Sequence, residues 1–199
     1  MDKSGATDNK KPQILAAAVE TFMQKGVAHT SMNDIVRASG MSKGGVYHYF
    51  ASKDELLVGV LEDFQEQHIN YLNLFPEGEL SHYEKVRYLI TGHRDLLDQM
   101  GKYNLMFIDL FAHSARIPVL KAAFNKSYED FHTVLEMMIG QGIQQGEFKA
   151  DVNPAAFASG LIGIFDGIGA GFMVAPKKVD YPNHAMEAAL YMLDGIRKV

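Results

Sequence analysis

The amino-acid sequence contains no cysteine. This absence excludes disulfide bonds, thiolate nucleophiles and cysteine-ligated metal sites. It also fits a chain that stays in a reducing compartment. Residues 1–11 are polar and lack the apolar stretch of a secretory signal. We therefore expect a cytoplasmic location.

Two signatures of catalytic and metal sites are also absent. The sequence has no His-Glu-x-x-His metal helix and no Gly-x-x-x-x-Gly-Lys-Ser/Thr phosphate loop. Its eight histidines are scattered along the chain. We accordingly expect no catalytic residue, no metal site and no cofactor, and an enzyme is the less favoured of the alternatives kept below.

Sustained two-residue alternation, the pattern of half-buried strands, is missing as well. Helical spacing dominates, and it predicts an all-α protein of about nine helices. Local start signals support these helices: Ser31 with Asp34 resembles a capping box, as do Ser52 with Glu55 and Ser81 with Glu84. Asn153 before a proline, and Asn183, are expected to cap the last two helices.

The charge is unevenly distributed. The 199 residues carry a net charge of −5, which argues weakly against nucleic-acid binding. Residues 1–53, however, hold seven Lys and Arg against four acidic residues, whereas residues 54–199 hold twelve against twenty. A basic head on an acidic body indicates that only the head meets a polyanion. We expect two domains, with residues 1–53 as the head and residues 54–199 as the body.

The densest pattern is a pair of short helices within residues 31–50, joined by a turn at Gly40. In a helix-turn-helix unit, the second helix enters the major groove of DNA. Four apolar residues can hold the pair together, namely Ile35, Met41, Val46 and Phe50. Four others are then left facing outward, namely Lys43, Gly44, Tyr47 and His48.

The second short helix carries Gly44 and Gly45, each of which costs about 1 kcal/mol relative to alanine inside a helix. Such a short helix would not carry them for stability, but glycine lets a backbone approach a phosphate or a base edge closely. The alternative is a merely structural three-helix head in which the tyrosines are core. For Tyr49, packing and phosphate contact are equally compatible with the sequence.

Residues 26–56, from Gly26-Val-Ala-His-Thr-Ser to Tyr-His-Tyr-Phe-Ala-Ser-Lys-Asp-Glu-Leu56, resemble the signature of the TetR family of repressors. The resemblance implies an N-terminal helix-turn-helix domain, a C-terminal domain that binds a ligand and dimerises, and loss of DNA binding when the effector is bound. Tyr49 stands where many members have histidine. By position, the resemblance assigns DNA contacts to Thr30, Ser31, Ser42, Lys43, Gly44, Tyr47, His48, Tyr49 and Lys53.

An effector pocket is expected among the middle helices, because methionine and aromatic side chains make adaptable apolar linings. The effector is then expected to be apolar or amphipathic. Ordinary core packing is the competing interpretation for each candidate. The candidates are Tyr88, Arg94, Met106, Phe107, Leu110, Phe111, Tyr128 and Phe131.

The apolar segment 155–175 is long enough to span a bilayer, but Asp166 at its centre makes a membrane span unfavourable. Small residues recur there every four positions and so share one helix face, which lets another helix come close. We expect this face, together with the last helix at residues 183–198, to form a homodimer interface, with no membrane involved. Packing in the core of the chain is the alternative that stays open. The residues of this face are Ser159, Gly163, Gly167 and Gly171.

Taken together, these features predict a ligand-responsive transcriptional repressor that binds palindromic double-stranded operator DNA as a homodimer and is released by a small-molecule effector. Two alternatives stay open. One is a helical scaffold that binds only protein, for which DNA binding that weakens with salt would be absent. The other is an enzyme.

Overall fold

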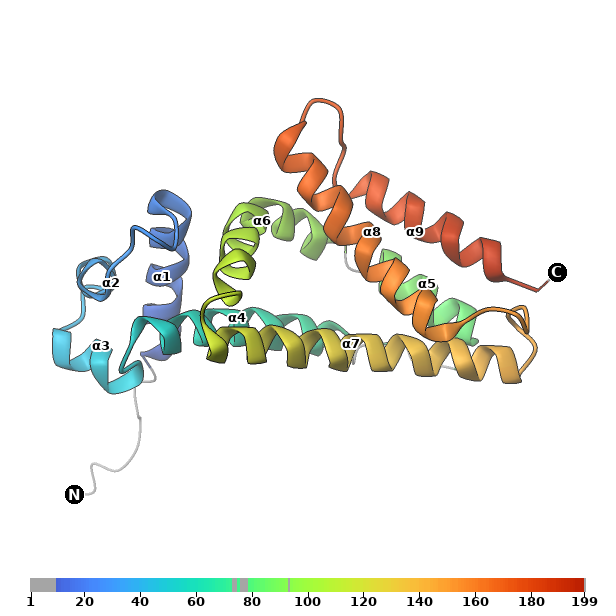
Figure 1. Cartoon of the computed structure of the whole chain (residues 1–199), viewed down its shortest axis with the longest axis horizontal. Coiled ribbons are helices and arrows are strands. Elements are labelled where there is room, and N and C mark those ends of the chain that lie inside the picture. The colour runs from blue at the N-terminus through green and yellow to red at the C-terminus, as the bar shows by residue number, and fades with distance from the viewer. Residues whose placement is uncertain (1–9, 73–74, 76–78, 93, 199) are drawn as a thin grey trace, which may run out of the picture.

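The computed structural model describes residues 10–72, 75, 79–92 and 94–198, and these residues form helices and no strand (Figure 1). The predicted all-α class is confirmed, and the described part of the chain holds nine helices. They are α1 (Lys11–Lys25), α2 (Met32–Ser39), α3 (Lys43–Tyr49), α4 (Lys53–Leu72), α5 (His82–Thr91), α6 (Arg94–Ser114), α7 (Pro118–Gln144), α8 (Pro154–Val174) and α9 (Asn183–Ile196).

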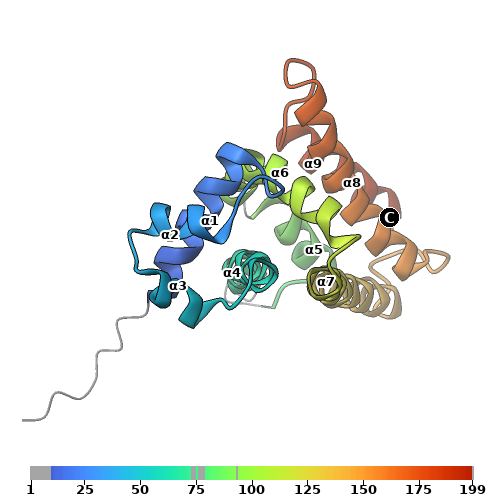
Figure 2. The same ribbon diagram turned by 60° about the vertical axis from the view of Figure 1, so that its left-hand side comes forward.

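The helices form a small head and a larger body. Helices α1–α3 make up the head at one end of the long axis, and α9 lies toward the opposite end (Figure 1). In the body, α7 packs against α4, α5, α6 and α8, while α9 packs against α5 and α8. Figure 2, which shows α4 and α7 nearly end-on, places α6 of the body between α1 of the head and α8.

Two apolar clusters hold the molecule together. The body cluster is built from α5, α7, α8, α9 and Phe148. The head cluster extends from α1–α3 into α4, α6 and α7, so the core has no break at residue 53, and a domain boundary there stays a prediction. The buried residues of the head cluster are Ile14, Leu15, Ala18, Phe22, Val27, Ile35, Val46, Phe50, Leu56, Leu57, Val60, Leu61, Met106, Leu110 and Leu120.

Most of the predicted helix starts are confirmed. Ser81 and Glu84 form a reciprocal capping box at α5, and the Asn153 side chain accepts the Ala156 N–H at 3.0 Å. The prediction for Asn183 is wrong by one position: Pro182 occupies the N-cap of α9, and Asn183 is the first helical residue. The Asn183 amide instead donates to Asp180 Oδ2 at 2.8 Å, because that carboxylate lies within its reach.

The loop after α7 holds α5 in place. Glu147 accepts the backbone N–H groups of His82 at 3.0 Å and Tyr83 at 2.9 Å, so its carboxylate satisfies two free donors at the start of α5. The neighbouring Phe148 is buried, and its ring lies against Gly142 of α7. A side chain at Gly142 would occupy the space that this ring fills.

Gly142→Ala and Gly140→Ala therefore form a matched pair on α7. A Cβ at Gly142 would clash with the Phe148 ring, whereas a Cβ at Gly140 meets nothing within 4 Å. We expect Gly142→Ala to lower the free energy of unfolding by about 1–3 kcal/mol. Gly140→Ala should leave it unchanged or raise it by up to about 1 kcal/mol.

Urea denaturation at one fixed protein concentration measures both changes, since the stability of an oligomer depends on concentration. Equal stability of the two variants would contradict the packing of Phe148 on Gly142.

Candidate nucleic-acid interface and its link to the body

The α2–α3 unit is shaped by two caps and one glycine turn. Ser31 Oγ accepts the Asp34 N–H at 3.3 Å while the Asp34 carboxylate accepts the Ser31 N–H at 2.9 Å, so the predicted capping box is confirmed. Gly40 ends α2 in the left-handed region with φ of 66°, which a residue without Cβ adopts readily. Ser42 Oγ then accepts the Gly45 N–H at 3.1 Å and starts α3.

The inner face of this unit is packed as predicted. Ile35, Val46 and Phe50 are buried in the head cluster, and Met41 packs against it. A Cβ at Gly59 of α4 would lie 2.5 Å from the Phe50 ring, so this glycine gives Phe50 room to dock on α4. Sequence reasoning missed Gly59, because nothing local marks a glycine whose neighbour lies nine residues away.

The outer face of α3 is open to solvent. Ser42, Lys43, Gly44 and His48 are exposed, and Tyr47 is 38% exposed. Lys43 Nζ lies 5.6 Å from the centre of the Tyr47 ring, within reach of a cation–π contact. One cation and two flat polar rings thus share a surface that plays no part in the core.

The two glycines of α3 differ in their surroundings. A Cβ at Gly45 would lie 3.2 Å from both Met41 Cε and Ser42 Oγ, so packing within the head accounts for a glycine there. A Cβ at Gly44 would meet nothing within 4 Å. Packing within the chain therefore gives no reason for glycine at position 44. A side chain at this position would contact only a partner outside the chain.

Other predicted contact residues have their polar groups engaged within the head. Thr30 is buried, and its hydroxyl donates to the Gly26 carbonyl at 2.8 Å. Ser31 Oγ donates to Asp34 Oδ2 at 2.5 Å. The half-buried Tyr49 accepts the Lys10 N–H at 3.4 Å and meets the His48 ring edge-on. Contacts of these side chains with DNA stay predictions.

Lys53 is also engaged. Its Nζ donates to the Val27 carbonyl at 2.5 Å, and burial lowers the pKa of its ammonium, partly offset by Asp54 and Asp109. The sequence placed Lys53 at the start of α4 but gave no sign of this partner. A contact between Lys53 and a phosphate likewise stays a prediction.

Asp34 joins α1 to α2 electrostatically. Its Oδ1 lies 2.8 Å from Lys25 Nζ and 2.6 Å from an Arg37 guanidinium nitrogen. The hydrogen bond from Lys25, followed by those from Ser31, holds the pKa of Asp34 far below its ordinary value. Two of the seven cations counted in the head are therefore partly neutralised, and Lys43 is the cation that the outer face of α3 presents.

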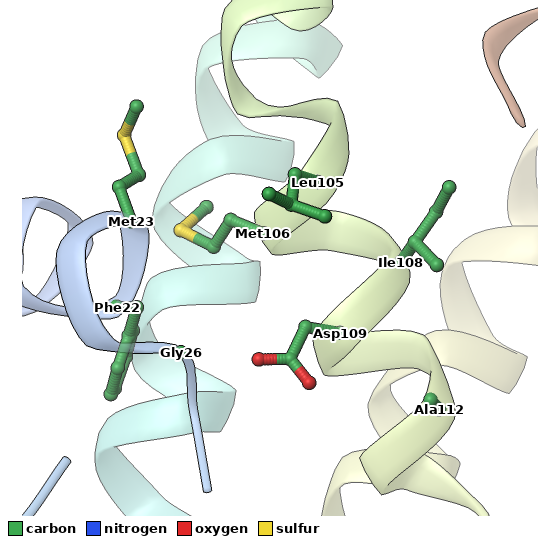
Figure 3. Close-up of a pocket in the computed structure, with 8 residues that line it drawn as sticks. All are labelled: Phe22, Met23, Gly26, Leu105, Met106, Ile108, Asp109 and Ala112. Carbon is green, nitrogen blue, oxygen red and sulfur yellow. The ribbon is translucent and has the colours of Figure 1, made fainter. Parts of the chain in front are cut away.

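A cavity of about 410 Å³ lies between α1 and α6, where the head meets the body. Met23 and Leu105 are exposed at its edge, and Asp109 contributes the one carboxylate of its lining. Figure 3 shows the Asp109 side chain extending from α6 toward Gly26 at the end of α1. The lining residues are Phe22, Met23, Gly26, Leu105, Met106, Ile108, Asp109 and Ala112.

The structure does not bring the predicted effector residues into one pocket. Met106 and Leu110 are buried in the head cluster, and the Phe107 ring lies tilted against that of Phe64, with ring centres 4.1 Å apart. Phe131 instead packs against the body cluster, and the Tyr88 ring lies 5.8 Å from that of Phe75.

Two further candidates for the effector pocket lie on the surface. Phe111 is 64% exposed and Tyr128 is 47% exposed. Arg94 is the first residue of α6, and its side chain lies outside the described residues.

One arrangement superficially resembles a hydrolase triad. His132 Nε2 lies 3.0 Å from Ser159 Oγ, and its Nδ1 lies 3.5 Å from Glu136 Oε2. The same Nε2, however, lies 3.1 Å from the Ala155 carbonyl, which can only accept a hydrogen bond. Nε2 must then carry a proton, so it cannot take one from Ser159 as a catalytic base does. The contacts tie α7 to α8.

In the described part of the chain, no group of three or more His, Asp or Glu residues is placed to hold a metal ion.

The small-residue face of α8 is uncovered in the single chain. Ser159, Gly163 and Gly167 are exposed, and a Cβ at either glycine meets nothing within 4 Å. Gly171 differs, since a Cβ there would touch Val179 at 3.6 Å. Among the described helices of at least 18 residues, α8 alone is apolar enough to cross a membrane, and only 22% of its most apolar stretch is buried. A core helix of a soluble protein passes the same test, so this is weak evidence for a membrane.

Comparisons with known proteins agree with this architecture. Residues 14–60 match the model of bacterial regulatory proteins of the tetR family, and residues 102–198 match that of the C-terminal domain of BetI-type transcriptional repressors. The HTH-type transcriptional regulator YfiR of Bacillus subtilis is 29% identical over 192 residues, which cover 93% of this chain and 91% of YfiR.

Solved structures show the same fold. GusR of Salmonella enterica superposes with a TM-score of 0.77 at 24% identity, covering 100% of both chains. FadR of Bacillus subtilis superposes with a TM-score of 0.77 at 21% identity, covering 92% of this chain and 95% of FadR. The two family matches, one at each end of an all-helical chain with a helix-turn-helix head, establish that the protein belongs to the TetR family of bacterial transcriptional regulators.

Proposed function

We propose that the protein is a cytoplasmic, ligand-responsive repressor that binds a pseudo-palindromic operator as a homodimer and leaves it when a small molecule binds. The observation that carries the proposal is the division of α3 into two faces. Val46 and Phe50 hold the helix in the head, whereas Lys43, Gly44 and Tyr47 take no part in the core. A seven-residue helix held in this way presents side chains outward.

Each residue of the outer face suits a different part of DNA. Lys43 supplies a positive charge for a phosphate, and the Ser42 hydroxyl still has its proton to donate while it caps α3. Tyr47 and His48 carry polar groups on stiff rings that can meet base edges in the major groove. Glycine at position 44 allows the backbone to approach the duplex without a side chain between them.

A homodimer supplies the second head that a palindrome requires. Two heads must reach successive major grooves, about 34–36 Å apart. The exposed face of α8 at Ser159, Gly163 and Gly167 is the surface we assign to the partner subunit, together with α9, where Tyr191 is 72% exposed. A second copy of α8 on this face would cover apolar surface that the single chain leaves in water.

The effector is expected to be apolar or amphipathic. One structure with the same fold, FadR of Bacillus subtilis in complex with stearoyl-CoA, supports this class. Another, a regulator from Saccharomonospora viridis with a TM-score of 0.79, is in complex with choline, which is a small hydrophilic cation. Of the candidate residues, Met106 also lines the cavity between α1 and α6. Release then requires that the effector bind the non-DNA-binding arrangement more tightly than the other.

Lys43→Ala tests the contact with phosphates. We expect it to weaken binding to all DNA, and to reduce the slope of log affinity against log salt by about 0.9 for each Lys43 that meets a phosphate. Lys121→Ala, which removes the same charge from an exposed position on α7, is the matched control. Fluorescence anisotropy with DNA upstream of the protein's own gene, at several salt concentrations, measures both.

If the wild-type protein shows no salt-sensitive DNA binding, the protein is better described as a scaffold. If Lys43→Ala and Lys121→Ala have the same slope, α3 is not the surface that meets DNA.

Tyr47→Phe and His48→Ala test base recognition. We expect each to change the preference for individual base pairs by about 1–3 kcal/mol at the affected position, because a lost base-edge contact removes discrimination there. Lys43→Ala should instead weaken all sequences by a similar factor. Competition binding against a library of single-base operator variants separates the two patterns, and unchanged preferences in both ring variants would remove α3 from base recognition.

Gly167→Leu tests the homodimer interface. The new side chain would project from the uncovered face of α8, where close helix contact leaves no room for it. We expect a monomer in sedimentation velocity at micromolar concentration, while Gly140→Leu, also at an open position, remains a dimer. A stable Gly167→Leu dimer means that the interface lies elsewhere.

A further inference from the structure

The connection between α1 and α2 is held by side chains that come from outside both helices. Gly26 ends α1, and the next residue, Val27, is completely buried in the head cluster. The Val27 N–H donates to Asp109 Oδ2 of α6 at 2.7 Å, and its carbonyl accepts from Lys53 Nζ of α4. Both backbone polar groups of one buried residue are thus satisfied by charged side chains of α4 and α6.

We propose that Asp109 and Lys53 form a polar clamp on Val27 that sets the orientation of the DNA-reading head on the body, and that Asp109 is the positioning residue through which α6 holds the head. The proposal rests on the proposed DNA-binding function. It also gives Lys53 an internal role instead of a contact with a phosphate.

The geometry of Asp109 suits this role. One carboxylate oxygen accepts the Val27 N–H at 2.7 Å. The other lies 3.2 Å from His113 Nδ1, which lies closer, at 2.8 Å, to the Asp109 carbonyl on the same helix. A hydrogen bond to a carboxylate is stronger than one between neutral groups, and it is directional. The other α6 contacts with the head, through Met106 and Leu110, are apolar and tolerate sliding.

The cavity beside Asp109 increases the importance of the hydrogen bond between Val27 and Asp109 for the orientation of the head. The cavity of about 410 Å³ is lined by residues of α1 and α6, and Asp109 lies in its lining (Figure 3). Helices in regulatory proteins shift by about 1–2 Å. A hydrogen bond of 2.7 Å does not survive that displacement, because a donor–acceptor distance near 3.6 Å is no longer a hydrogen bond. A modest movement of α6 would therefore free Val27.

Val27 lies close to the residues that read DNA. Gly26, Val27 and Thr30 belong to the segment that leads into the capping box at Ser31, and the Val27 carbonyl also accepts the Thr30 N–H at 3.3 Å. Release of Val27 loosens the start of α2, and α2 holds α3 through Ile35 and Val46. The clamp thus acts on the reading helix through one short segment.

The experiment compares full-length Asp109→Ala, Asp109→Asn, Lys53→Met and Asp130→Ala. Asparagine keeps an oxygen that can accept the Val27 N–H, whereas alanine does not. Asp130→Ala is the control for charge, because it removes a carboxylate that pairs with Lys126 on the surface of α7. Binding to DNA upstream of the protein's own gene is measured against salt, together with hydrogen exchange at the Val27 amide.

We expect Asp109→Ala to weaken operator binding by about 2- to 30-fold and to speed hydrogen exchange at the Val27 amide. In Asp109→Asn, the operator affinity and the exchange rate should both lie close to their wild-type values. Asp130→Ala should change neither. Lys53→Met should weaken binding while leaving the salt slope at the wild-type value, unlike Lys43→Ala, because an internal contact releases no counterion.

Three results would overturn the clamp. The first is that Asp109→Ala binds the operator as tightly as the wild-type protein. The second is that Asp109→Ala and Asp109→Asn lose the same amount of operator affinity. The third is that Lys53→Met reduces the slope of log affinity against log salt as much as Lys43→Ala does. If Asp109→Ala does not fold, the Lys53→Met slope decides alone.

Failure of the DNA-binding function itself would look different. The wild-type protein would then bind no DNA in a salt-sensitive manner, and exchange at Val27 in the Asp109 variants would still report whether the clamp exists.

Discussion

The reading helix α3 cannot hold its own shape, and the arrangement of the head follows from this constraint. It has seven residues, two of them glycine, whereas isolated helices shorter than about 12–15 residues are marginal in water. Its stability must come from packing, which Val46 and the adjoining Phe50 provide through the head cluster. The inner face of α3 provides that packing. The outer face does not contribute to the core and can therefore carry Lys43, Tyr47 and His48.

The same dependence ties the head to the body. The head cluster includes Met106 and Leu110 of α6, so the head's core is completed by residues that lie far along the chain. Burial of apolar surface favours docking of the head on α6, but it specifies the orientation of the head poorly. The free energy of burial depends on the area buried and not on the angle between the helices. The hydrogen bond between Val27 and Asp109 adds the missing direction. A regulator needs both properties, namely a head that stays attached and an orientation that a small movement can change.

The sequence predicted what depends on neighbouring residues. The capping boxes at Ser31 and Ser81 span three positions each, and the turn at Gly40 needs one glycine, so these signals are complete in a short window. The division of α3 into faces follows from helical periodicity, which also concerns only near neighbours. These features account for the fold class, the helix count in the described part of the chain and the outer face of α3.

What the sequence could not predict depends on partners distant along the chain. Val27 and Asp109 are separated by 82 positions, and Lys53 reaches back 26 positions to the same residue. Nothing near Lys53 distinguishes an ammonium that binds a phosphate from one that binds a carbonyl. The residues predicted to bind the effector do not line one pocket, for a related reason. Phe107 and Phe111 are both aromatic residues of α6, yet Phe107 is half-buried against Phe64 and Phe111 is exposed. Composition does not distinguish a core from a pocket or a surface.

Helix α8 shows how one glycine-rich segment can serve two contacts. A Cβ at Gly160 would lie 2.8 Å from Met192 Cε of α9, so this glycine allows close packing within the chain. Gly163 and Gly167 have no such neighbour, although glycine in a helix costs about 1 kcal/mol relative to alanine. Packing inside the chain offsets that cost at Gly160 but not at the other two positions. In the proposed homodimer, a second subunit approaching along the same small-residue face would offset that cost at Gly163 and Gly167.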